Sequence, residues 1–153
     1  MVRAIIFSDS HRQFNPMMQA IEKESPIDWI IHAGDVQSDV DDLKIVYPQI
    51  PIVSVKGNND FFVPDAENDR FFSLGGIKIF LTHGHNYGVK YSYAKLWKHA
   101  EGLGADLCIF GHTHQSINEK MGKVTLFNPG SASRSYGVLN AENGTFNLTL
   151  VNI

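Results

Sequence analysis

Cysteine is almost absent from this sequence, which has one, Cys108, in 153 residues. A single cysteine forms no internal disulfide, so burial of apolar side chains must hold the fold together. Cys108 lies in the apolar run Leu107–Phe110, which predicts a buried small side chain rather than a reactive thiol. A chain so poor in cysteine fits the reducing cytoplasm, where we expect this protein.

Long hydrophobic runs and an excess of basic residues are also missing. No apolar run approaches the roughly 18 residues that cross a bilayer, so no membrane partner is expected. Lys and Arg number 13 against 16 Asp and Glu, a net charge of −3 that lacks the basic footprint of a dedicated nucleic-acid binder. A local basic face remains compatible with the sequence and involves Lys90, Lys95, Lys98 and Lys120.

The apolar content, 43% of the residues, is enough for one globular domain, which we expect to span residues 1–153. The first 60 residues predict strands over 2–7, 29–33 and 51–55, separated by two helices. The first helix is expected over 16–24, with Asn15 as its N-cap and Pro16 at its first position. The second is expected to begin in the solvated acidic stretch of residues 38–42 and to end by Pro48. This β-α-β-α-β order is typical of a parallel sheet with helices packed on it.

The second half is richer in strands. Gly75-Gly76 predicts a hairpin between strands 70–74 and 77–82. Ser92 is expected to cap a helix that runs to about Glu101 and stops at Gly102 or Gly104. Further strands are expected over 107–110, 116–120, 123–127, 135–139 and 146–151, with turns at Met121-Gly122 and Asn143-Gly144.

Histidine is abundant for a small acidic chain: there are seven, and most fall in short polar motifs. Each motif begins within about three residues of the end of a predicted strand. In order they are Asp9-Ser10-His11, Gly34-Asp35, Gly57-Asn58-Asn59-Asp60, Thr82-His83-Gly84-His85 and Gly111-His112-Thr113-His114. Ligands bind parallel α/β sheets at the carboxyl ends of the strands, so five loops are expected to bring these side chains to one edge.

The residue types in these motifs indicate a metal site. In an extended segment, residues two apart point the same way, so Asp-x-His and His-x-His each direct two donors at one ion. Nitrogen and oxygen donors without thiolate suit Mn²⁺, Fe, Co, Ni or Zn. Any one motif alone is explained as well by a turn or a surface histidine. The seven donors together suit two ions if one carboxylate bridges: Asp9, His11, Asp35, Asn58, His83, His112 and His114.

The ordered motifs resemble those of the calcineurin-like metallophosphoesterases, and the small size and residues 128–131, Asn-Pro-Gly-Ser, resemble their YfcE-type phosphodiesterases. The resemblance implies an α/β fold, an αββα sandwich of two mixed sheets flanked by helices. It implies that Asp35 bridges two divalent metals, for which Mn²⁺ is our first choice. The first metal would be held by Asp9, His11 and His114, and the second by Asn58, His83 and His112.

The implied activity is hydrolysis of small phosphodiesters by a hydroxide that bridges the two metals. Many members of the family carry histidine after the metal-binding asparagine, where it protonates the leaving group, whereas this chain has Asn59. We assign Asp35, Asn58 and His85 to catalysis, and His85, Asn59 and Arg12 to substrate contacts. Asp60 is expected either to orient a ligand or to cap a turn.

Other polar and aromatic side chains are given structural roles. His32 lies inside a predicted strand and is expected to be structural, whereas His99 is expected to face solvent on its helix. The Asn-Pro-Gly-Ser segment is expected to form a turn that could also close the site. The remaining aromatics near the motifs are expected to form core or cleft walls: Phe61, Phe62, Tyr87, Tyr91 and Tyr93.

Two alternative functions remain open. One is a non-catalytic protein-binding scaffold of the same fold, similar to the retromer subunit, which has lost part of the histidine set. The other is a nuclease, against which the absence of basic runs weighs because phosphate contacts dominate affinity for nucleic acids. The sequence is also compatible with a homo-oligomer.

Overall fold

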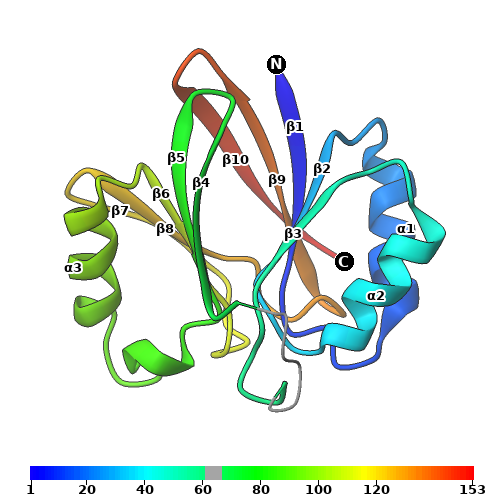
Figure 1. Cartoon of the computed structure of the whole chain (residues 1–153), viewed down its shortest axis with the longest axis horizontal. Helices are drawn as coiled ribbons and strands as arrows, with labels where there is room; N and C mark the ends of the chain where they lie inside the picture. The colour runs from blue at the N-terminus through cyan, green and yellow to red at the C-terminus, as the bar shows by residue number, and fades with distance from the viewer. Residues whose placement is uncertain (61–66) are drawn as a thin grey trace.

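Two five-stranded sheets pack face to face in the computed structural model, which describes residues 1–60 and 67–153 (Figure 1). Phe61 and Phe62, which were expected to form core or cleft walls, lie outside the described residues. The elements are β1 (Val2–Phe7), α1 (Phe14–Glu24), β2 (Trp29–His32), α2 (Gln37–Val46), β3 (Ile52–Ser54), β4 (Asp69–Leu74), β5 (Ile77–Thr82), η1 (His85–Tyr87), α3 (Ala94–Leu103), β6 (Leu107–Ile109), β7 (Ile117–Met121), β8 (Val124–Asn128), β9 (Ser135–Glu142) and β10 (Thr145–Asn152).

Both sheets are mixed. The first has the strand order β10-β9-β1-β2-β3, in which β1, β2 and β3 are parallel while β9 and β10 run antiparallel. The second has the order β4-β5-β6-β8-β7, with parallel β5, β6 and β8 between antiparallel edge strands. All the strands predicted in the second half are present, with bounds shifted by at most three residues.

Side-chain alternation along the central strands divides the apolar residues into three layers. In β1, Ala4 and Ile6 face the second sheet, whereas Ile5 and Phe7 face the helices α1 and α2. In β6, Leu107 and Ile109 face the first sheet, while Cys108 points to α3. Cys108 is fully buried, as expected, and burial raises the pKa of its thiol. The helices therefore cover the two outer faces (Figure 1), and the αββα sandwich is confirmed.

The helix starts differ from the predictions. Helix α1 begins at Phe14, so Asn15 is not its N-cap and Pro16 is its third residue, where a missing N–H is still tolerated. Helix α2 begins at Gln37, whose N–H donates to Asp60 Oδ1 at 3.0 Å. The acidic start was expected to be solvated, but this is wrong for Asp39, which is buried. A contact with a distant loop therefore supports the start of α2.

Helix α3 follows the sequence signals more closely. The N-cap is Tyr93, one residue after the predicted cap, while the Ser92 hydroxyl accepts a hydrogen bond from the Ala94 N–H at 3.1 Å. Gly104, in the left-handed conformation, ends the helix, and Gly102 lies within it. No helix among residues 1–60 and 67–153 is long and apolar enough to cross a membrane.

The parallel strands of the two sheets end at one common edge, the lower edge in Figure 1. There the chain leaves β1, β2, β3, β5 and β6 through five polar loops. These loops contain the motifs singled out in the sequence.

Candidate metal centre

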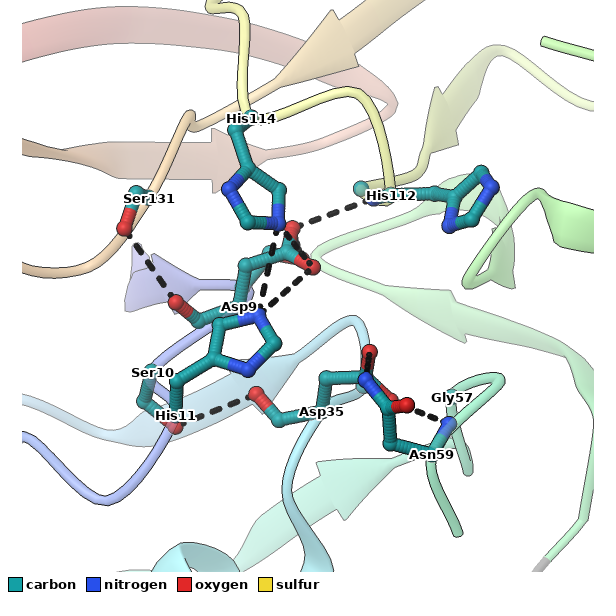
Figure 2. Close-up of polar contacts among 12 residues, drawn as sticks. Asp9, Ser10, His11, Asp35, Gly57, Asn59, His112, His114 and Ser131 are labelled. Atoms are coloured by element: carbon teal, nitrogen blue, oxygen red, sulfur yellow. Dashed lines mark hydrogen bonds and ion pairs between the residues drawn. The ribbon is translucent and has the colours of Figure 1, made fainter. Parts of the chain in front are cut away.

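Asp9, at the end of β1, is the side chain around which the other polar groups gather (Figure 2). Its Oδ2 accepts hydrogen bonds from the Ser8 hydroxyl at 2.7 Å and from the His112 N–H at 3.0 Å. Its Oδ1 is buried and has no hydrogen-bond partner among the described residues. A buried carboxylate oxygen without a donor is costly unless a cation completes its surroundings.

Two histidines from distant loops approach this oxygen on one side. The Nε2 atoms of His114 and His11 lie 3.4 Å and 3.8 Å from Asp9 Oδ1, and 3.3 Å from each other. The three side chains form a group whose ligand atoms all lie within 4.8 Å of one another. The spacing and donor types suit one transition-metal ion.

A second group lies on the other side of Asp9. His83 Nε2 is 3.0 Å from Asn58 Oδ1, 3.5 Å from Asp35 Oδ2 and 3.7 Å from Asp9 Oδ1. His112 Nδ1 is 3.1 Å from the same Asn58 oxygen. All seven predicted ligands are therefore brought together, and Asp9 is common to both groups of acidic and histidine side chains.

The tautomer of His83 provides a test of whether this group fits a cation. Its Nδ1 lies 2.7 Å from the Ala33 carbonyl oxygen, which can only accept, so Nδ1–H is the donor. In the neutral ring Nε2 then carries a lone pair, and it faces three oxygen acceptors from Asn58, Asp35 and Asp9. Four lone-pair atoms converge with no donor between them, which is the arrangement that a bound cation requires.

Asn59 holds Asp35 with two hydrogen bonds. The Asn59 N–H donates to Asp35 Oδ1 at 3.1 Å, and its Nδ2 donates to Oδ2 at 2.9 Å (Figure 2). Close backbone approach is also required here, because a Cβ atom on Gly57 would overlap Asp35 Oδ1. Asn59 therefore fixes the orientation of a predicted ligand.

The backbone of the site is strained. Asp9, His11, Arg12, Asp35, His112 and His114 all have positive φ angles, and only one other described non-glycine residue, Asn143, does. Side chains with a Cβ atom rarely adopt this conformation, and it persists where surrounding contacts over-determine it. The strain is therefore concentrated in the loops that present the ligands.

A buried hydrogen-bond network holds the first two loops together. The Ser10 hydroxyl donates to Asp39 Oδ2 at 2.6 Å and lies 3.1 Å from His32 Nε2. His32 Nδ1 accepts from the Gly34 N–H at 3.1 Å, so Nε2–H is the donor to Ser10. The structural role predicted for His32 is confirmed, and burial lowers its pKa to about 4. No local sequence signal marks Asp39, because its partners Ser10 and Arg12 lie in the loop after β1.

Asn128, at the end of β8, holds the loop that contains His112 and His114. It is fully buried, and its Nδ2 donates to the Gly111 carbonyl at 3.1 Å and to Thr113 Oγ1 at 3.0 Å. Its Oδ1 accepts from the Gly130 N–H at 2.8 Å, which closes the predicted turn. Ser131 then donates to the Asp9 carbonyl at 3.2 Å. The Asn-Pro-Gly-Ser segment thus connects two ligand loops.

The remaining candidates lie at the margin of the site. Half-buried His85 places its ring 5.5 Å from that of His83, and its buried Nδ1 has no partner in the described chain. Burial, and then the neighbouring His83, lower the pKa of His85. Arg12 is exposed beside the site. Asp60 accepts from the N–H groups of Gly57 and Gln37, so it caps the loop and the start of α2.

Burial and nearby charges also lower the pKa of His112. Its pKa is lowered to about 4, mainly by desolvation and then by the nearby His83 and Lys90. The ring is therefore neutral near pH 7, the form that a metal ligand requires.

His99 and the aromatic side chains near the motifs differ in their exposure. His99 is exposed, as expected, with its ring 5.0 Å from that of Phe80. Tyr87 and Tyr93 are half-buried and pack against the second sheet. Tyr91 is 95% exposed, so it is not part of the core, but it lines an open cleft, the other role that was expected for it.

The model of the calcineurin-like phosphoesterase superfamily domain matches residues 2–149. This chain belongs to that superfamily. The resemblance that the motifs carry is thus confirmed, and phosphoester hydrolysis dependent on divalent metals is the activity of the family.

Three similar proteins illustrate the range of this superfamily. The probable metallophosphoesterase YsnB of Bacillus subtilis is 35% identical over 152 residues, covering 93% of this chain and 86% of YsnB. The phosphodiesterase YfcE of Escherichia coli K12 is 31% identical over 109 residues, covering 60% of this chain and 53% of YfcE. The crystal structure of Vps29 from Entamoeba histolytica, complexed with Zn²⁺, has a TM-score of 0.79 and 19% identity, covering 99% of both chains.

Proposed function

We propose that this metallophosphoesterase is a phosphodiesterase that uses two divalent ions to hydrolyse small phosphodiesters. The observation that carries the proposal is Asp9 Oδ1, a buried oxygen without a donor in the described chain that is common to two groups of carboxylate and histidine side chains. Its relative YfcE is named a phosphodiesterase, which supports a diester substrate. Mn²⁺ is our first choice of ion, with Ni²⁺, Zn²⁺, Fe and Co²⁺ as alternatives.

We assign Asp9, His11 and His114 to one ion and Asn58, His83 and His112 to the other, with Asp35 as the bridge. The geometry supports the second set of ligands, because Asn58 Oδ1 lies within 3.1 Å of nitrogens of both His83 and His112. The two groups of ligand atoms share Asp9, whereas the bridge by Asp35 rests on the resemblance to the family. When bound, a pair of divalent ions supplies an activated water nucleophile and neutralises the charge of the phosphate. The ligands that would hold this pair are oriented by their neighbours: the Ala33 carbonyl fixes the ring of His83, and Asn59 fixes the carboxylate of Asp35.

Substrate contacts are proposed for the residues at the margin. The ring of His85 lies 6.1 Å from that of His112, so it borders the space where a phosphate would bind. Arg12, the exposed residue that follows His11 in the chain, offers a positive charge. Asn59 donates both of its hydrogen bonds to Asp35 and carries no titratable proton, so it contributes no acid to the leaving group.

The proposal is tested by hydrolysis of bis-p-nitrophenyl phosphate. The chain is treated with a chelator, and Mn²⁺, Ni²⁺, Zn²⁺ or Mg²⁺ is added back. Activity should depend on the added metal and should fall by at least about 10²-fold in Asp35→Ala and His114→Ala. Matched variants at the surface, Asp41→Ala and His99→Ala, should keep the activity. Hydrolysis without metal, or full activity in both site variants, would refute the assignment.

The alternative of a protein-binding scaffold receives its support from the fold shared with Vps29. A scaffold function gives no role to a complete donor set arranged around an unpaired carboxylate oxygen, so we favour the enzyme. A nuclease remains distinguishable by its salt dependence, since phosphate contacts along a long chain weaken steeply with added salt.

A further inference from the structure

The loop from Thr82 to Tyr87, which contains His83 and His85, is held at both of its ends by one carboxylate. The Thr82 hydroxyl donates to Asp69 Oδ1 at 2.6 Å, and the Tyr87 hydroxyl donates to Asp69 Oδ2 at 2.8 Å. Asp69 is the first residue of β4, and the register of the sheet places it opposite Thr82 on β5. A single side chain of the edge strand therefore connects the first and last residues of this loop.

The last part of the loop is the short helix η1, which is anchored on the outer face of the second sheet. The Tyr87 N–H donates to the Gly84 carbonyl at 2.9 Å and closes the turn. The Tyr87 ring packs edge-on against Phe80, with 6.0 Å between the ring centroids. Lys95 on α3 adds a hydrogen bond from its Nζ to the Asn86 carbonyl at 3.2 Å. The backbone of η1 is thus fixed from β4, β5 and α3.

The two histidines of this loop differ in how they are held. The ring of His83 has an anchor of its own, because its Nδ1 donates to the Ala33 carbonyl. The buried Nδ1 of His85 has no hydrogen-bond partner in the described chain. The place of the His85 ring, 5.5 Å from that of His83, therefore depends on the backbone of η1. Tyr87 and Asp69 are the residues that anchor this backbone through their side chains.

We propose that Asp69 and Tyr87 are positioning residues that place His85 for contact with the substrate phosphate. The inference rests on the proposed phosphodiesterase function and deepens it, because it adds two residues outside the donor set. Both act through the backbone of η1, since the Tyr87 hydroxyl donates to Asp69 and not to a candidate ligand. Removal of this hydroxyl should release His85 and leave the metal ligands in place, because His83 keeps its bond to Ala33.

The test is a double-mutant cycle with Tyr87→Phe and His85→Ala, in which calorimetry measures the binding of inorganic phosphate to the full chain loaded with Mn²⁺. Tyr87→Phe keeps the ring that packs against Phe80 and removes only the hydroxyl. It should weaken phosphate binding about tenfold when His85 is present, and it should have no further effect in His85→Ala. The affinity for Mn²⁺, from a titration without phosphate, should be unchanged in Tyr87→Phe.

Two further variants complete the experiment. Asp69→Ala removes the acceptor of both hydroxyls and should weaken phosphate binding at least as much as Tyr87→Phe does. Tyr136→Phe is the matched control, because the Tyr136 hydroxyl donates to another carboxylate, Glu24 Oε1, at 2.9 Å, beside Arg3 at the start of β1. This control should bind phosphate and Mn²⁺ as the wild type does.

The outcomes separate this inference from the proposed function. Unchanged phosphate affinity in Tyr87→Phe, or a loss that persists in the His85→Ala background, would overturn the positioning role while metal-dependent hydrolysis of bis-p-nitrophenyl phosphate by the wild type persists. A parallel loss of Mn²⁺ affinity would also overturn it, because Tyr87 would then act on the metal ligands. A wild type that binds neither Mn²⁺ nor phosphate and hydrolyses no diester would overturn the proposed function and the inference with it. A loss of phosphate affinity that requires His85, with Mn²⁺ affinity intact, would support both.

Discussion

His32 is enclosed completely, and its Nδ1 accepts a hydrogen bond from the Gly34 N–H, which requires the neutral ring. Burial lowers its pKa from 6.5 to about 4, so the unfolded chain takes up a proton in this range that the folded chain does not. Stability is therefore complete above about pH 6.5 and falls as the pH falls towards 4.

Urea unfolding in the presence of a chelator measures this contribution. The free energy of unfolding should fall by about 2 kcal/mol through His32 between about pH 7.5 and pH 5. His32→Asn should be less stable at neutral pH but should show a shallower dependence on pH. His99→Gln, on the exposed face of α3, is the control, and an unchanged slope in His32→Asn would contradict the prediction.

Asp9 is expected to lower the stability of the metal-free protein and to be needed for metal binding. Its Oδ1 faces nitrogens of His11, His83 and His114 and has no donor in the described chain. In Asp9→Asn, the amide could donate to one of these rings while its oxygen still accepts from His112. We expect chelator-treated Asp9→Asn to gain about 1 kcal/mol of stability and to lose metal binding, measured by urea unfolding and metal titration. Asp41→Asn, at the surface, should change neither, and tight metal binding by Asp9→Asn would refute this role.

We expect Asn59 to limit the range of substrates. A group that protonates the leaving oxygen typically accelerates ester hydrolysis by about 10²–10⁴-fold, and Asn59 supplies none. Esters with poor leaving groups should therefore be hydrolysed slowly, and activated aryl diesters quickly. Steady-state rates for an alkyl phosphomonoester and an aryl phosphodiester provide the comparison, and equal rates would show that another acid acts.

The candidate metal centre depends on the loops that follow the strands, and Asn128 at the end of β8 supports one of these loops. It joins the end of β8 to the loop after β6 through both of its donors. In Asn128→Ala the loop that contains His112 and His114 loses these bonds. Groups that orient metal ligands typically contribute about 10–100-fold to metal affinity, which is the loss we expect.

Metal titration of Asn128→Ala gives the measurement. Asn128→Asp keeps the acceptor for Gly130 and loses the donors, so it should weaken metal binding as well. Asn118→Ala removes an exposed asparagine on β7 and should have no effect. If Asn128→Ala folds and binds metal as tightly as the wild type, the loop is held in place by other contacts.

At the scale of the whole molecule, the centre joins the two sheets. Asp9, Asp35 and Asn58 follow strands of the first sheet, whereas His83 and His112 follow strands of the second. A cation bound by both sets should therefore stabilise the folded sandwich against the separated loops of the unfolded chain.

Thermal unfolding should show this coupling. At a metal concentration about 100 times the Kd, the gain is about 2.7 kcal/mol, which corresponds to an increase in Tm of roughly 5–10 °C for a chain of this size. The increase should disappear with a chelator and should be strongly reduced in His114→Ala. His99→Ala, which lies on α3, should show the full increase, and an equal increase in both variants would point to metal binding elsewhere.

The fold class and the candidate ligands follow from local pattern. Short apolar runs define the strands, and motifs of Asp, Asn and His at their ends mark one edge, because parallel strands end together. These signals lie within a few residues of one another in the chain, so Asp9, His11, His83, His112 and His114 are identifiable without coordinates. The early start of α2 and the burial of Asp39 are not predictable from local pattern, because their partners, Asp60 and Ser10, come from other loops.

Local sequence defines which residue types are available: a cysteine-free donor set of carboxylates, an amide and imidazoles, which follow five strand ends. The orientation of each donor comes from the tertiary structure, because Ala33, Asn59 and Asn128 act across long stretches of chain. It also decided that Tyr91 is open rather than part of the core, since exposure depends on how a turn is placed against two packed sheets. The donor types of the site thus follow from short sequence motifs, whereas their arrangement depends on contacts between loops of both sheets.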